Sequence, residues 1–447
     1  MRHLPRLFAT KTLFAIALAT LLFGSLSRYL GQNKYVQNVD FYVYYFAAQV
    51  IHDDPHANIY EGATDGNPQT RYVATGGELP AHARAAGFDS IQLYIYPPLL
   101  ADTLAPFSGI TPHHAVILWR AFNLALVLGS CMLLAGMLRV PIIGFEFVVL
   151  ALAAYSFFPI HEAISLGQVT VVMLALWTVG ILAYSEDRMF LSAAAFALAT
   201  ALKVTPILLV PLFFIWKDRR WIVSYIAVSL GLVGLMVAIN GWHTVSVYPA
   251  VMSAMGGGMP SLQNKSIGSL LTWIYYRRIF TMDSAMEVID TLPRGLMMVT
   301  KAASGIFYLY CLYLAWRSRE IDRFSRAGVL AVFGVVTVCM SPVAWRHGYS
   351  VAFLALAIYW VKELRTPTRP LRSVLLALMT ITLGCFFVDV IAQIHMPQLF
   401  KILIAGSWVI FSVPFCLDTL SYASADDHAS TSKELDPAMV SAAASGA

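Results

Sequence analysis

The sequence predicts an all-α protein that crosses a membrane several times, and three observations predict it. Of the 447 residues, 58% are hydrophobic and only 12% are charged, which is about half the charged share of a typical water-soluble domain. Apolar segments close to the length needed to cross a bilayer recur along the chain. Basic residues gather in the short loops between these segments, as in polytopic membrane proteins. The net charge of +5 therefore reflects topology, and no nucleic-acid partner is indicated.

We expect about eleven or twelve membrane segments, some of which cross the bilayer only in part. The basic stretch before the first segment is similar to the start of a signal peptide, but no A-x-A-like cleavage site follows it. An uncleaved first helix is therefore favoured. The expected segments cover residues 12–30, 115–138, 142–158, 166–184, 189–201, 203–216, 221–239, 302–316, 327–344, 348–362, 373–392 and 399–420.

Charge divides the loops between the two sides of the membrane. The basic loops lie on the same side of the membrane as the N-terminus. The positive-inside rule therefore places this side in the cytosol. Residues 31–114 carry three Lys or Arg against eight Asp or Glu, so this segment is predicted to face outward. The same alternation places residues 161–168, 240–301 and 341–349 on the outer side. Four outward elements rich in polar and aromatic residues predict one composite cleft. The cytosolic basic residues are Arg2, Arg6, Lys11, Arg139, Arg188, Lys217, Arg219, Arg220, Arg317, Arg319, Arg323, Arg326, Lys362, Arg365, Arg369 and Arg372.

Asp40 is the most informative residue of the outer segment. It lies about ten residues after the first apolar segment and opens a Tyr-rich, amphipathic stretch, DFYVYYFAAQVI. An acid at this place suggests a carboxylate held beside a lipid-borne substrate. A second interpretation makes Asp40 the N-cap of a helix that begins at Phe41. Capping would lower the pKa of Asp40 and weaken it as a base, so the two roles compete.

Lys203 and Pro206 interrupt the apolar run of residues 189–216. Cytosolic loops are expected at both ends of this run, and a limb of about 14 residues rises only about 21 Å. The hairpin is therefore expected to turn inside the membrane. Lys203 would then be an intramembrane cation that needs an anionic partner such as a lipid phosphate. Alternatively, its ammonium group reaches the membrane interface or contacts carbonyl groups at a helix end.

Several short motifs, taken in their order, resemble glycosyltransferase family 87. They include YIYPPLLADTLAPF at residues 94–107, SLGQVTVVMLAL at 165–176, ALKVTPILLVPLFFIWKDRRW at 201–221, NKS at 264–266 and SPVAWRHGY at 341–349. The resemblance spans roughly residues 1–420. It implies a GT-C-type transmembrane catalytic domain with a large extracytosolic loop at residues 31–114 and a second at 240–301. It leaves residues 421–447 as a disordered cytosolic tail.

The resemblance also implies a reaction and a set of roles. These enzymes move a sugar, mannose in many cases, from a polyprenyl-phosphate donor to a hydroxyl of a lipid or glycan acceptor. Asp40 stands where the family has its catalytic acid, and would be the general base of an inverting transfer. His347 stands in the family's Trp-x-His turn, although Gly348 follows it where a second ring is common.

The remaining candidates fall into two groups. Lys203, Arg346 and His347 would bind the donor phosphate. Lys265 stands where the family often has Gln, which suggests a cation in place of an amide. Residues expected to bind the sugar or acceptor are Gln168, Asn264, Ser266 and Tyr96, with Trp345 and Trp273 as further stacking candidates.

No metal or other cofactor is expected, because a donor that joins sugar and lipid through a single phosphate does not require one. The sequence HDDPH at residues 52–56 could hold a metal ion, but its proline favours a turn. The five cysteines lie in apolar segments without paired spacing and are expected to pack as small apolar residues. If the chain is bacterial, it would be a multi-pass inner-membrane protein with its site facing the periplasm.

Two other classes of function remain open from the residues. A secondary transporter is also polytopic and can contain an intramembrane lysine, but transporters often have paired halves with matching interrupted helices. Only one interrupted hairpin occurs here. A non-catalytic protein that binds membrane lipids is the third class, and it should tolerate the change Asp40→Asn.

Overall fold

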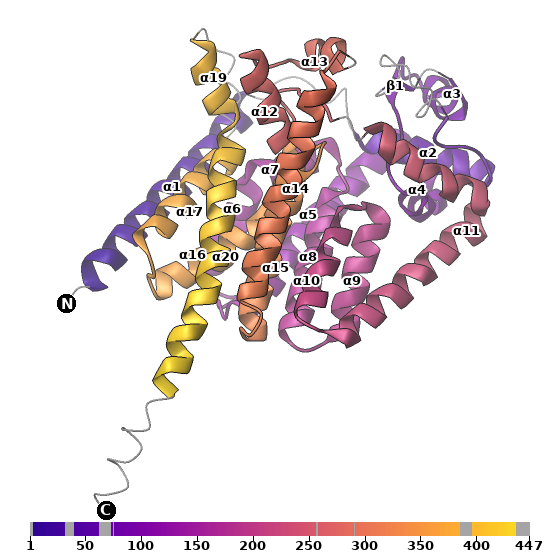
Figure 1. Cartoon of the computed structure of the whole chain (residues 1–447). Helices are drawn as coiled ribbons and strands as arrows, with labels where there is room; N and C mark the ends of the chain where they lie inside the picture. The colour runs from indigo at the N-terminus through magenta and orange to yellow at the C-terminus, as the bar shows by residue number, and fades with distance from the viewer. Residues whose placement is uncertain are drawn as a thin grey trace, which may run out of the picture.

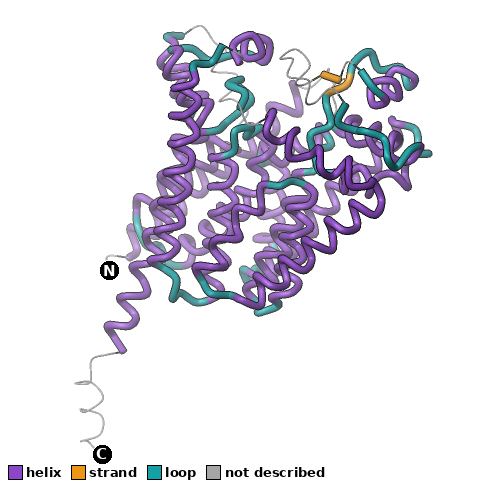
Figure 2. The backbone as a smooth tube through the Cα atoms, turned by 45° about the vertical axis from the view of Figure 1, so that its right-hand side comes forward, coloured by secondary structure: helices purple, strands orange, loops and turns teal. Residues whose placement is uncertain are grey.

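The computed structural model describes residues 3–31, 40–61, 73–74, 76–255, 258–289, 291–384 and 396–434. Helices make up most of this part of the chain, as Figures 1 and 2 show. The strands β1 (Val73–Ala74) and β2 (Ile91–Gln92) form one short antiparallel pair. The fold class predicted from composition and hydropathy is confirmed.

The helices follow the apolar segments of the sequence. The longer helices are α1 (His3–Gly31), α5 (Pro112–Met137), α8 (Thr170–Ser185), α11 (Arg219–Met255), α14 (Arg294–Arg317), α15 (Arg323–Met340), α17 (Pro370–Gly384) and α20 (Ser407–Glu434). The shorter ones are α2 (Phe41–Asp53), α3 (Glu78–Ala85), α4 (Pro98–Leu104), α6 (Phe145–Ser156), α7 (Phe158–Leu166), α9 (Met189–Leu202), α10 (Val210–Ile215), α12 (Ile267–Tyr276), α13 (Met282–Ile289), α16 (Ala352–Arg365) and α19 (Gln398–Ala405). Three 3₁₀ turns are η2 (Ala105–Phe107), η3 (Thr205–Leu209) and η4 (Arg346–Val351).

Five of the described helices are long and apolar enough to cross a membrane, and there are seven spans if each of two bent helix pairs counts as one. The pairs are α6 with α7, bent by 60°, and α19 with α20, bent by 47°. This number is below the eleven or twelve segments that the sequence predicts. The difference arises because other predicted segments form apolar helices of only 10 to 17 residues, among them α8, α9 and α17.

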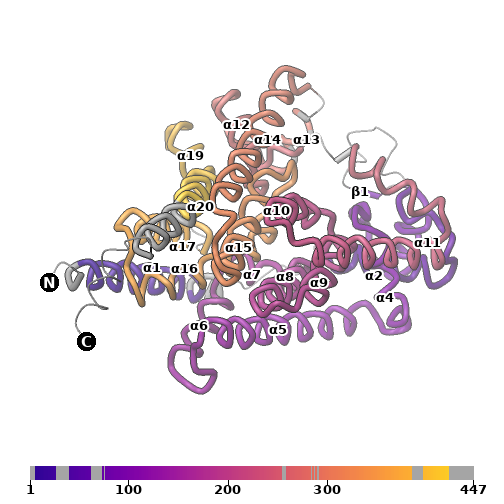
Figure 3. The backbone as a smooth tube through the Cα atoms, turned by 60° about the horizontal axis from the view of Figure 1, so that its bottom comes forward, coloured from indigo at the N-terminus to yellow at the C-terminus, as the bar shows by residue number. Residues whose placement is uncertain are grey.

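The helices of the bundle lie side by side. Figure 3 shows α5, α8, α9 and α11 in succession, and each of them contacts the next. The outward surfaces of α5, α11 and α14 carry large apolar side chains, and contiguous exposed apolar surface marks contact with lipid or protein. A bilayer around the bundle explains this surface. Examples are Ile117, Leu118 and Phe122 on α5, Val223 and Leu230 on α11, and Met298, Ile306 and Leu309 on α14.

The interrupted hairpin has the local structure that the sequence predicts. Helix α9 ends at Leu202, Lys203 is its C-cap with extended backbone, and η3 begins at Thr205 with Pro206 in its first turn. Proline at the start of a turn costs no hydrogen bond, because the first N–H groups have no intrahelical partner. The chain therefore reverses within a few residues around Lys203.

Helix α2 is more buried than an interfacial amphipathic helix would be. Nine of its thirteen residues are buried, because α3, α4, η2 and α5 all contact it. Together α2, α3, α4 and the β1–β2 pair lie at the same end of the molecule as α12 and α13, and the start of α1 and the end of α20 lie toward the opposite end (Figure 1). The protein therefore has one end built from loops and short helices.

The tail differs from the expectation. Helix α20 continues to Glu434, so residues 421–434, expected to be disordered, are helical, and 435–447 lie outside the described residues. Neither Gly nor Pro occurs between Pro414 and Glu434 to stop the helix. Cys131, Cys311, Cys339 and Cys416 are buried free thiols, as expected for packing residues, and Cys385 lies outside the described part.

Candidate active site

A cavity of about 410 Å³ opens at the end of the molecule that carries the short helices. Each of the four segments predicted to face outward contributes residues to it, so the expected composite cleft exists among the described residues. Of the eight candidate site residues, five line this one cavity. The lining residues are Asp40, Val43, Tyr44, Gln92, Leu93, Ile95, Tyr96, Glu162, Leu166, Gln168, Gln263, Met282, Trp345, Arg346 and His347.

Asp40 is held by a hydrogen-bond network inside the cavity. The Gln168 side-chain amide donates from Nε2 to Oδ2 of Asp40. The carbonyl Oε1 of the same amide accepts from the Tyr44 hydroxyl at 2.7 Å and from the Tyr96 hydroxyl at 3.3 Å. The two tyrosines thus fix the amide, and the amide fixes the carboxylate.

The turn after α7 explains why Gln168 lies beside Asp40. Gly167 is the C-cap of α7 and has a left-handed backbone with φ of 66°, which glycine adopts without steric cost. A Cβ atom at this position would lie 2.7 Å from Cβ of Phe41, the residue after Asp40. The Trp119 indole N–H donates to the Gly167 carbonyl at 2.7 Å. Glycine therefore allows the two segments to approach closely enough for the Gln168–Asp40 bond.

The structure also decides between the two interpretations of Asp40. Asp40 occupies the N-cap position of α2, but its side chain makes no capping hydrogen bond. The carboxylate points instead to Gln168. The capping interpretation is therefore wrong, and the carboxylate belongs to the cavity.

Burial makes Asp40 a stronger base than a solvent-exposed aspartate. Asp40 precedes α2, outside the membrane-spanning helices, and desolvation raises the pKa of its carboxyl group to about 6. The hydrogen bond from Gln168 lowers this pKa, the negative charge of Glu162 raises it, and the positive charge of Lys203 lowers it. Such a carboxylate is ionised near neutral pH and still accepts a proton readily.

Glu162 is a second acid in the cavity that the sequence did not single out. It forms an ion pair with Arg346, in which Oε1 of Glu162 contacts Nη2 of Arg346. The Arg346 guanidinium also lies over the ring of Phe158, 5.2 Å from its centroid. Both charged side chains are largely buried, so this pair fixes Arg346 in the cavity wall. The available signal was an acid inside the segment at 161–168, which is predicted to face outward.

His347 lies in the cavity wall as a buried residue, with 5% of its surface exposed. Its Nε2 atom has no hydrogen-bond partner among the described residues. Burial lowers the pKa of His347 well below its usual value, and the charges of Lys203 and Arg346 lower it further. The imidazole is therefore neutral at pH 7 and has one ring nitrogen available to a ligand.

Lys203 lies in a small neighbouring cavity of about 40 Å³, which Trp345 lines together with it. Trp345 also lines the large cavity, so it separates the two. Within the described part of the chain, the Lys203 ammonium group has no hydrogen bond or ion pair, although its charge acts on both Asp40 and His347. A cation close to the site thus lacks a direct anionic partner.

Asn264 and Ser266 lie outside the cavity, contrary to their expected role. The Asn264 amide donates to the Met259 and Pro342 carbonyls at 2.7 and 2.8 Å and accepts from Ala344 N–H at 2.8 Å. Ser266 is the N-cap of α12. The Asn264 side chain therefore holds the loop at 258–266 against the turn at 341–349, and the Ser266 side chain caps α12 by accepting from the Ser269 N–H at 3.1 Å. The physical reason is that fully buried amide and hydroxyl groups must be paired within the protein.

Lys265 and Trp273 are likewise parts of the packing. Lys265 is buried, and its Nζ donates to the Ala405 carbonyl at 3.3 Å between the rings of Trp273 and Trp408. The Trp273 indole N–H donates to the Pro260 carbonyl at 2.6 Å. Neither side chain lines the cavity. Trp273 is therefore not placed to stack on a sugar in this cavity, as the sequence had suggested.

The possible metal ligands of the HDDPH sequence are engaged differently. Asp53 pairs with His82 at 3.0 Å, and Asp54 accepts from the backbone N–H of His56 at 2.9 Å, which makes a turn. Among the described residues, no group of three or more His, Cys, Asp or Glu side chains is arranged to hold a metal ion.

Comparison with known proteins supplies the family. Among curated proteins, no relative matches this chain. The profile of glycosyltransferase family 87 matches residues 94–342, which is more than half of the chain. The matched stretch contains Tyr96, Glu162, Gln168 and Lys203, whereas Asp40 and the residues from Trp345 to His347 join the site through the fold. The chain belongs to glycosyltransferase family 87.

Proposed function

We propose that this membrane glycosyltransferase transfers a sugar from a polyprenyl-phosphate donor to an acceptor hydroxyl, with Asp40 as the general base. One observation carries the proposal. A buried carboxylate with a raised pKa is oriented by Gln168 in a cavity that Arg346 and His347 also line. A base and a set of phosphate-binding groups thus face the same space.

The reaction needs only a base and groups that bind the phosphate. As the acceptor oxygen attacks the anomeric carbon of the sugar, Asp40 takes the proton from the acceptor hydroxyl. The new carbon–oxygen bond forms on the face opposite the bond to phosphate, so the anomeric configuration inverts. The bond to phosphate breaks, and its electron pair leaves with the lipid monophosphate.

Three groups are suited to stabilise the leaving phosphate. Lys203 supplies a positive charge that lacks a direct ion pair, Arg346 supplies a fixed guanidinium, and the neutral His347 supplies one ring nitrogen. Groups that contact the phosphate most strongly as negative charge develops lower the activation barrier. Gln168 and Tyr96 line the same cavity, so they can also contact sugar or acceptor hydroxyl groups.

The outer side of the membrane is the proposed location of the site. The cavity lies at the end of the molecule with the short helices, and the start of α1 and the end of α20 lie toward the other end (Figure 1). The basic loops at 186–188, 217–220 and 317–326 connect helices away from the cavity, which agrees with the positive-inside rule. A bacterial inner membrane, with the site facing the periplasm, satisfies this arrangement.

The test is transfer by the purified protein in lipid vesicles. Mannose linked to polyprenyl phosphate is the first donor to test, followed by other sugars on the same lipid, with extracted membrane lipids and glycans as acceptors. We expect a glycosylated product whose anomeric configuration is opposite to that of the donor. Uptake of a solute without glycosyl transfer would favour a transporter, and transfer with retained configuration would contradict the proposed mechanism.

The pH dependence should report the surroundings of Asp40. Because the base must be ionised, kcat/KM of the wild type is expected to fall as the pH drops below about 6. Replacing Gln168 by Leu removes a hydrogen bond that lowers the pKa of Asp40, so the acid limb should move to higher pH. Replacing Glu162 by Gln removes a negative charge that raises the pKa, so the limb should move to lower pH.

These two variants control for each other, because a general loss of structure would not shift the limb in opposite directions. The measurement is kcat/KM against pH at a fixed acceptor concentration. If kcat/KM falls at the same acidic pH in the wild type and in both variants, a group other than Asp40 controls the rate.

A further inference from the structure

An apolar cavity of about 330 Å³ lies among α1, α6, α16 and α17. It shares no lining residue with the cavity of Asp40. Glu146, Arg365 and Thr380 are the polar residues in a lining that is otherwise apolar. The residues that line it are Phe14, Ala17, Leu18, Leu21, Val140, Phe145, Glu146, Val149, Leu150, Ala153, Phe157, Phe353, Leu356, Ala357, Trp360, Val361, Leu364, Arg365 and Thr380.

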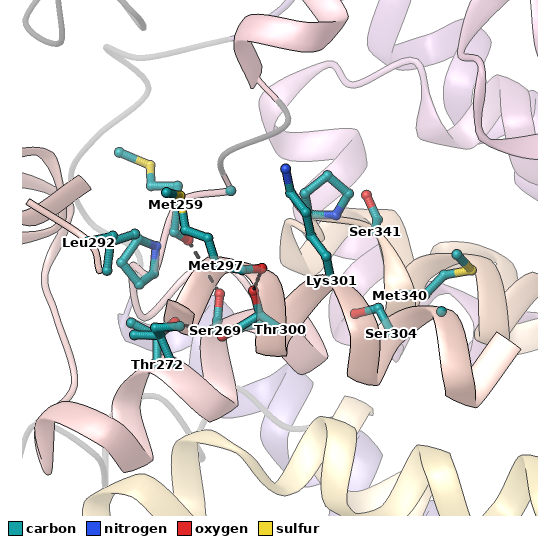
Figure 4. A pocket seen from close by; sticks show the side chains of 16 residues that line it. Met259, Ser269, Thr272, Leu292, Met297, Thr300, Lys301, Ser304, Met340 and Ser341 are labelled. Atoms are coloured by element: carbon teal, nitrogen blue, oxygen red, sulfur yellow. Dashed lines mark hydrogen bonds between the residues drawn. The ribbon is translucent and has the colours of Figure 1, made fainter. Parts of the chain in front are cut away.

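The cavity between α12 and α14, of about 240 Å³, has a different lining. Figure 4 shows that a lysine and several hydroxyl groups surround it, namely those of Lys301, Ser269, Thr272, Thr300, Ser304 and Ser341. Such a lining suits a polar ligand. The apolar cavity is therefore the better place for a hydrocarbon chain.

Three helices each present one stripe of side chains to the apolar cavity. On α16 the lining residues recur at intervals of three and four from Phe353 to Arg365, which is the spacing of one helical face. The same spacing runs along α1 from Phe14 to Leu21, and α6 supplies the third stripe. From Phe353 to Arg365 the helix rises about 18 Å, slightly more than one leaflet of a hydrocarbon core about 30 Å thick. The cavity therefore has the length of one lipid chain in a single leaflet.

The two ends of this cavity differ in burial. At one end Phe157 and Phe353 are buried, and their ring centroids lie 5.9 Å apart. At the other end Phe145 is 78% exposed and Arg365 is also exposed. The cavity is therefore closed at the Phe157 end and has its mouth at Arg365, beside the basic loop at 362–372.

Polar groups inside the cavity are already paired. The Trp360 indole N–H donates to the Thr380 hydroxyl at 2.9 Å, and this hydroxyl donates to the Leu376 carbonyl at 2.7 Å. The edge of the Trp360 ring also contacts Phe14, with centroids 5.2 Å apart. The interior thus offers an occupant apolar contacts and no polar group that needs a partner from it.

The mouth carries positive charge. Arg365 donates from Nη2 to the Arg139 carbonyl at 3.3 Å, and it has no ion pair among the described residues. A guanidinium has five N–H donors, so one bond to a carbonyl leaves others for a ligand. Glu146 also lines the mouth, but it lies in the first turn of α6 and its carboxylate approaches Gly144, the N-cap of the same helix. The carboxylate is thus placed to interact with the helix N-terminus.

We infer that this cavity binds one acyl chain of an anionic phospholipid from the leaflet on the side of the basic loops, with the lipid phosphate on Arg365. The planar guanidinium matches the geometry of a phosphate group. Basic pockets between membrane helices on the cytosolic side bind anionic head groups in this way. The lipid takes no part in sugar transfer. It fills the space between α1, α6 and α16 and stabilises their packing.

The arrangement disfavours two other lipids. Arg365 is the last residue of α16, whereas η4, which carries Arg346 and His347 of the active-site cavity, directly precedes this helix. A polyprenyl-phosphate donor with its phosphate on Arg365 would therefore hold its sugar far from Asp40. A zwitterionic phospholipid would place an ammonium group beside Arg365 and Arg139, which repel it.

The experiment uses two variants with matched controls. Arg365→Gln removes the charge at the mouth. Its control is Arg317→Gln, because Arg317 is also the exposed last residue of a helix and does not line the cavity. Ala153→Phe fills part of the cavity from α6. Its control is Ala151→Phe, because Ala151 is also a partly exposed residue of α6 and does not line the cavity. Val149→Trp fills the same space should Ala153→Phe not fold.

Each protein is purified whole, freed of lipid in detergent, and titrated with phosphatidylglycerol or with phosphatidylcholine that carries the same acyl chains. Native mass spectrometry measures the bound lipid, and thermal unfolding measures the stabilisation that binding gives. The wild type should bind phosphatidylglycerol about tenfold more tightly than phosphatidylcholine.

The two variants should each lose about tenfold in affinity for phosphatidylglycerol. For Arg365→Gln the reason is the loss of hydrogen bonds between charged groups. For Ala153→Phe the reason is that about two methylene groups of the chain lose their burial. Arg317→Gln and Ala151→Phe should bind as the wild type does.

Three results would overturn the inference. If the folded variants with Phe at 153 or Trp at 149 keep the wild-type affinity, the lipid binds elsewhere on the protein. If phosphatidylcholine binds as tightly as phosphatidylglycerol, or Arg365→Gln keeps its affinity, the charge at the mouth does not hold the lipid. If polyprenyl phosphate displaces phosphatidylglycerol at a lower concentration than phosphatidylglycerol itself requires, the occupant is that lipid. No readout uses sugar transfer, so the inference and the proposed function fail independently.

Discussion

Sugar transfer by the Asp40→Asn variant is expected to be slower than that of the wild type by about 10²–10⁴-fold, the usual contribution of a positioned general base. Asparagine has nearly the same shape, and its side-chain oxygen can still accept the hydrogen bond that Gln168 donates to Asp40. The fold of the cavity should therefore persist, while the group that accepts the proton is lost. The loss should appear in kcat, with a small change in KM for the donor.

Asp102→Asn is the matched control for this prediction. Asp102 lies in α4, outside the cavity, and accepts a hydrogen bond from the Asn240 amide at 2.9 Å. It is thus another acid paired with an amide on the same side of the molecule. Its substitution should leave the rate within a few-fold of the wild type. Transfer at the wild-type rate by Asp40→Asn would instead favour a non-catalytic protein that binds lipid.

Replacing Lys203 by methionine should reduce kcat/KM for the donor by about 10²–10³-fold, the range found when one group that stabilises developing negative charge is removed. Methionine keeps most of the apolar stem and removes the charge. The charge of Asp40 acts on the ammonium group, but no ion pair joins Lys203 to an acid among the described residues, so its removal breaks no direct contact with a buried anion. The fold should therefore tolerate the change. The measurement is initial rate against donor concentration.

Lys203→Arg distinguishes charge from packing at the same position. Arginine restores the positive charge, so it should recover part of the activity that methionine loses. An equal loss in both variants would assign Lys203 a purely structural role at the end of α9. Wild-type kinetics in the methionine variant would remove Lys203 from the mechanism.

The sequence predicted the parts of the site that depend on membrane sidedness. Asp40, Gln168, Arg346 and His347 lie in segments that charge alternation places on one side, and all four line one cavity. Lys203 was found because a charged residue in an apolar run is costly. These signals are local in the chain and do not require the tertiary structure.

The parts that depend on tertiary contacts could not be predicted in this way. Tyr44 lies within an aromatic stretch, and only the packing of α2 shows that its hydroxyl contacts Gln168. Asn264 is a polar residue in an outward loop, which suited a ligand-binding role equally well. Whether such an amide meets a sugar or a backbone carbonyl depends on how two distant loops fold together.

The helix lengths show the same limit. Hydropathy correctly marked α8 and α9 as apolar and helical. Their length falls short of a full span because buried helices need only fill the interior of the bundle. Apolar composition alone does not distinguish a helix surrounded by other helices from one surrounded by lipid.

The two tyrosine hydroxyls that share one oxygen of Gln168 have a further consequence. Rotating this amide by half a turn would bring its oxygen against the ionised Asp40 carboxylate, which can only accept hydrogen bonds, and the two oxygens would repel each other. The amide therefore presents an N–H group to the carboxylate. Removing both phenols would take the two donors from the amide oxygen and leave the contact with Asp40 to orient the amide alone among the described side chains.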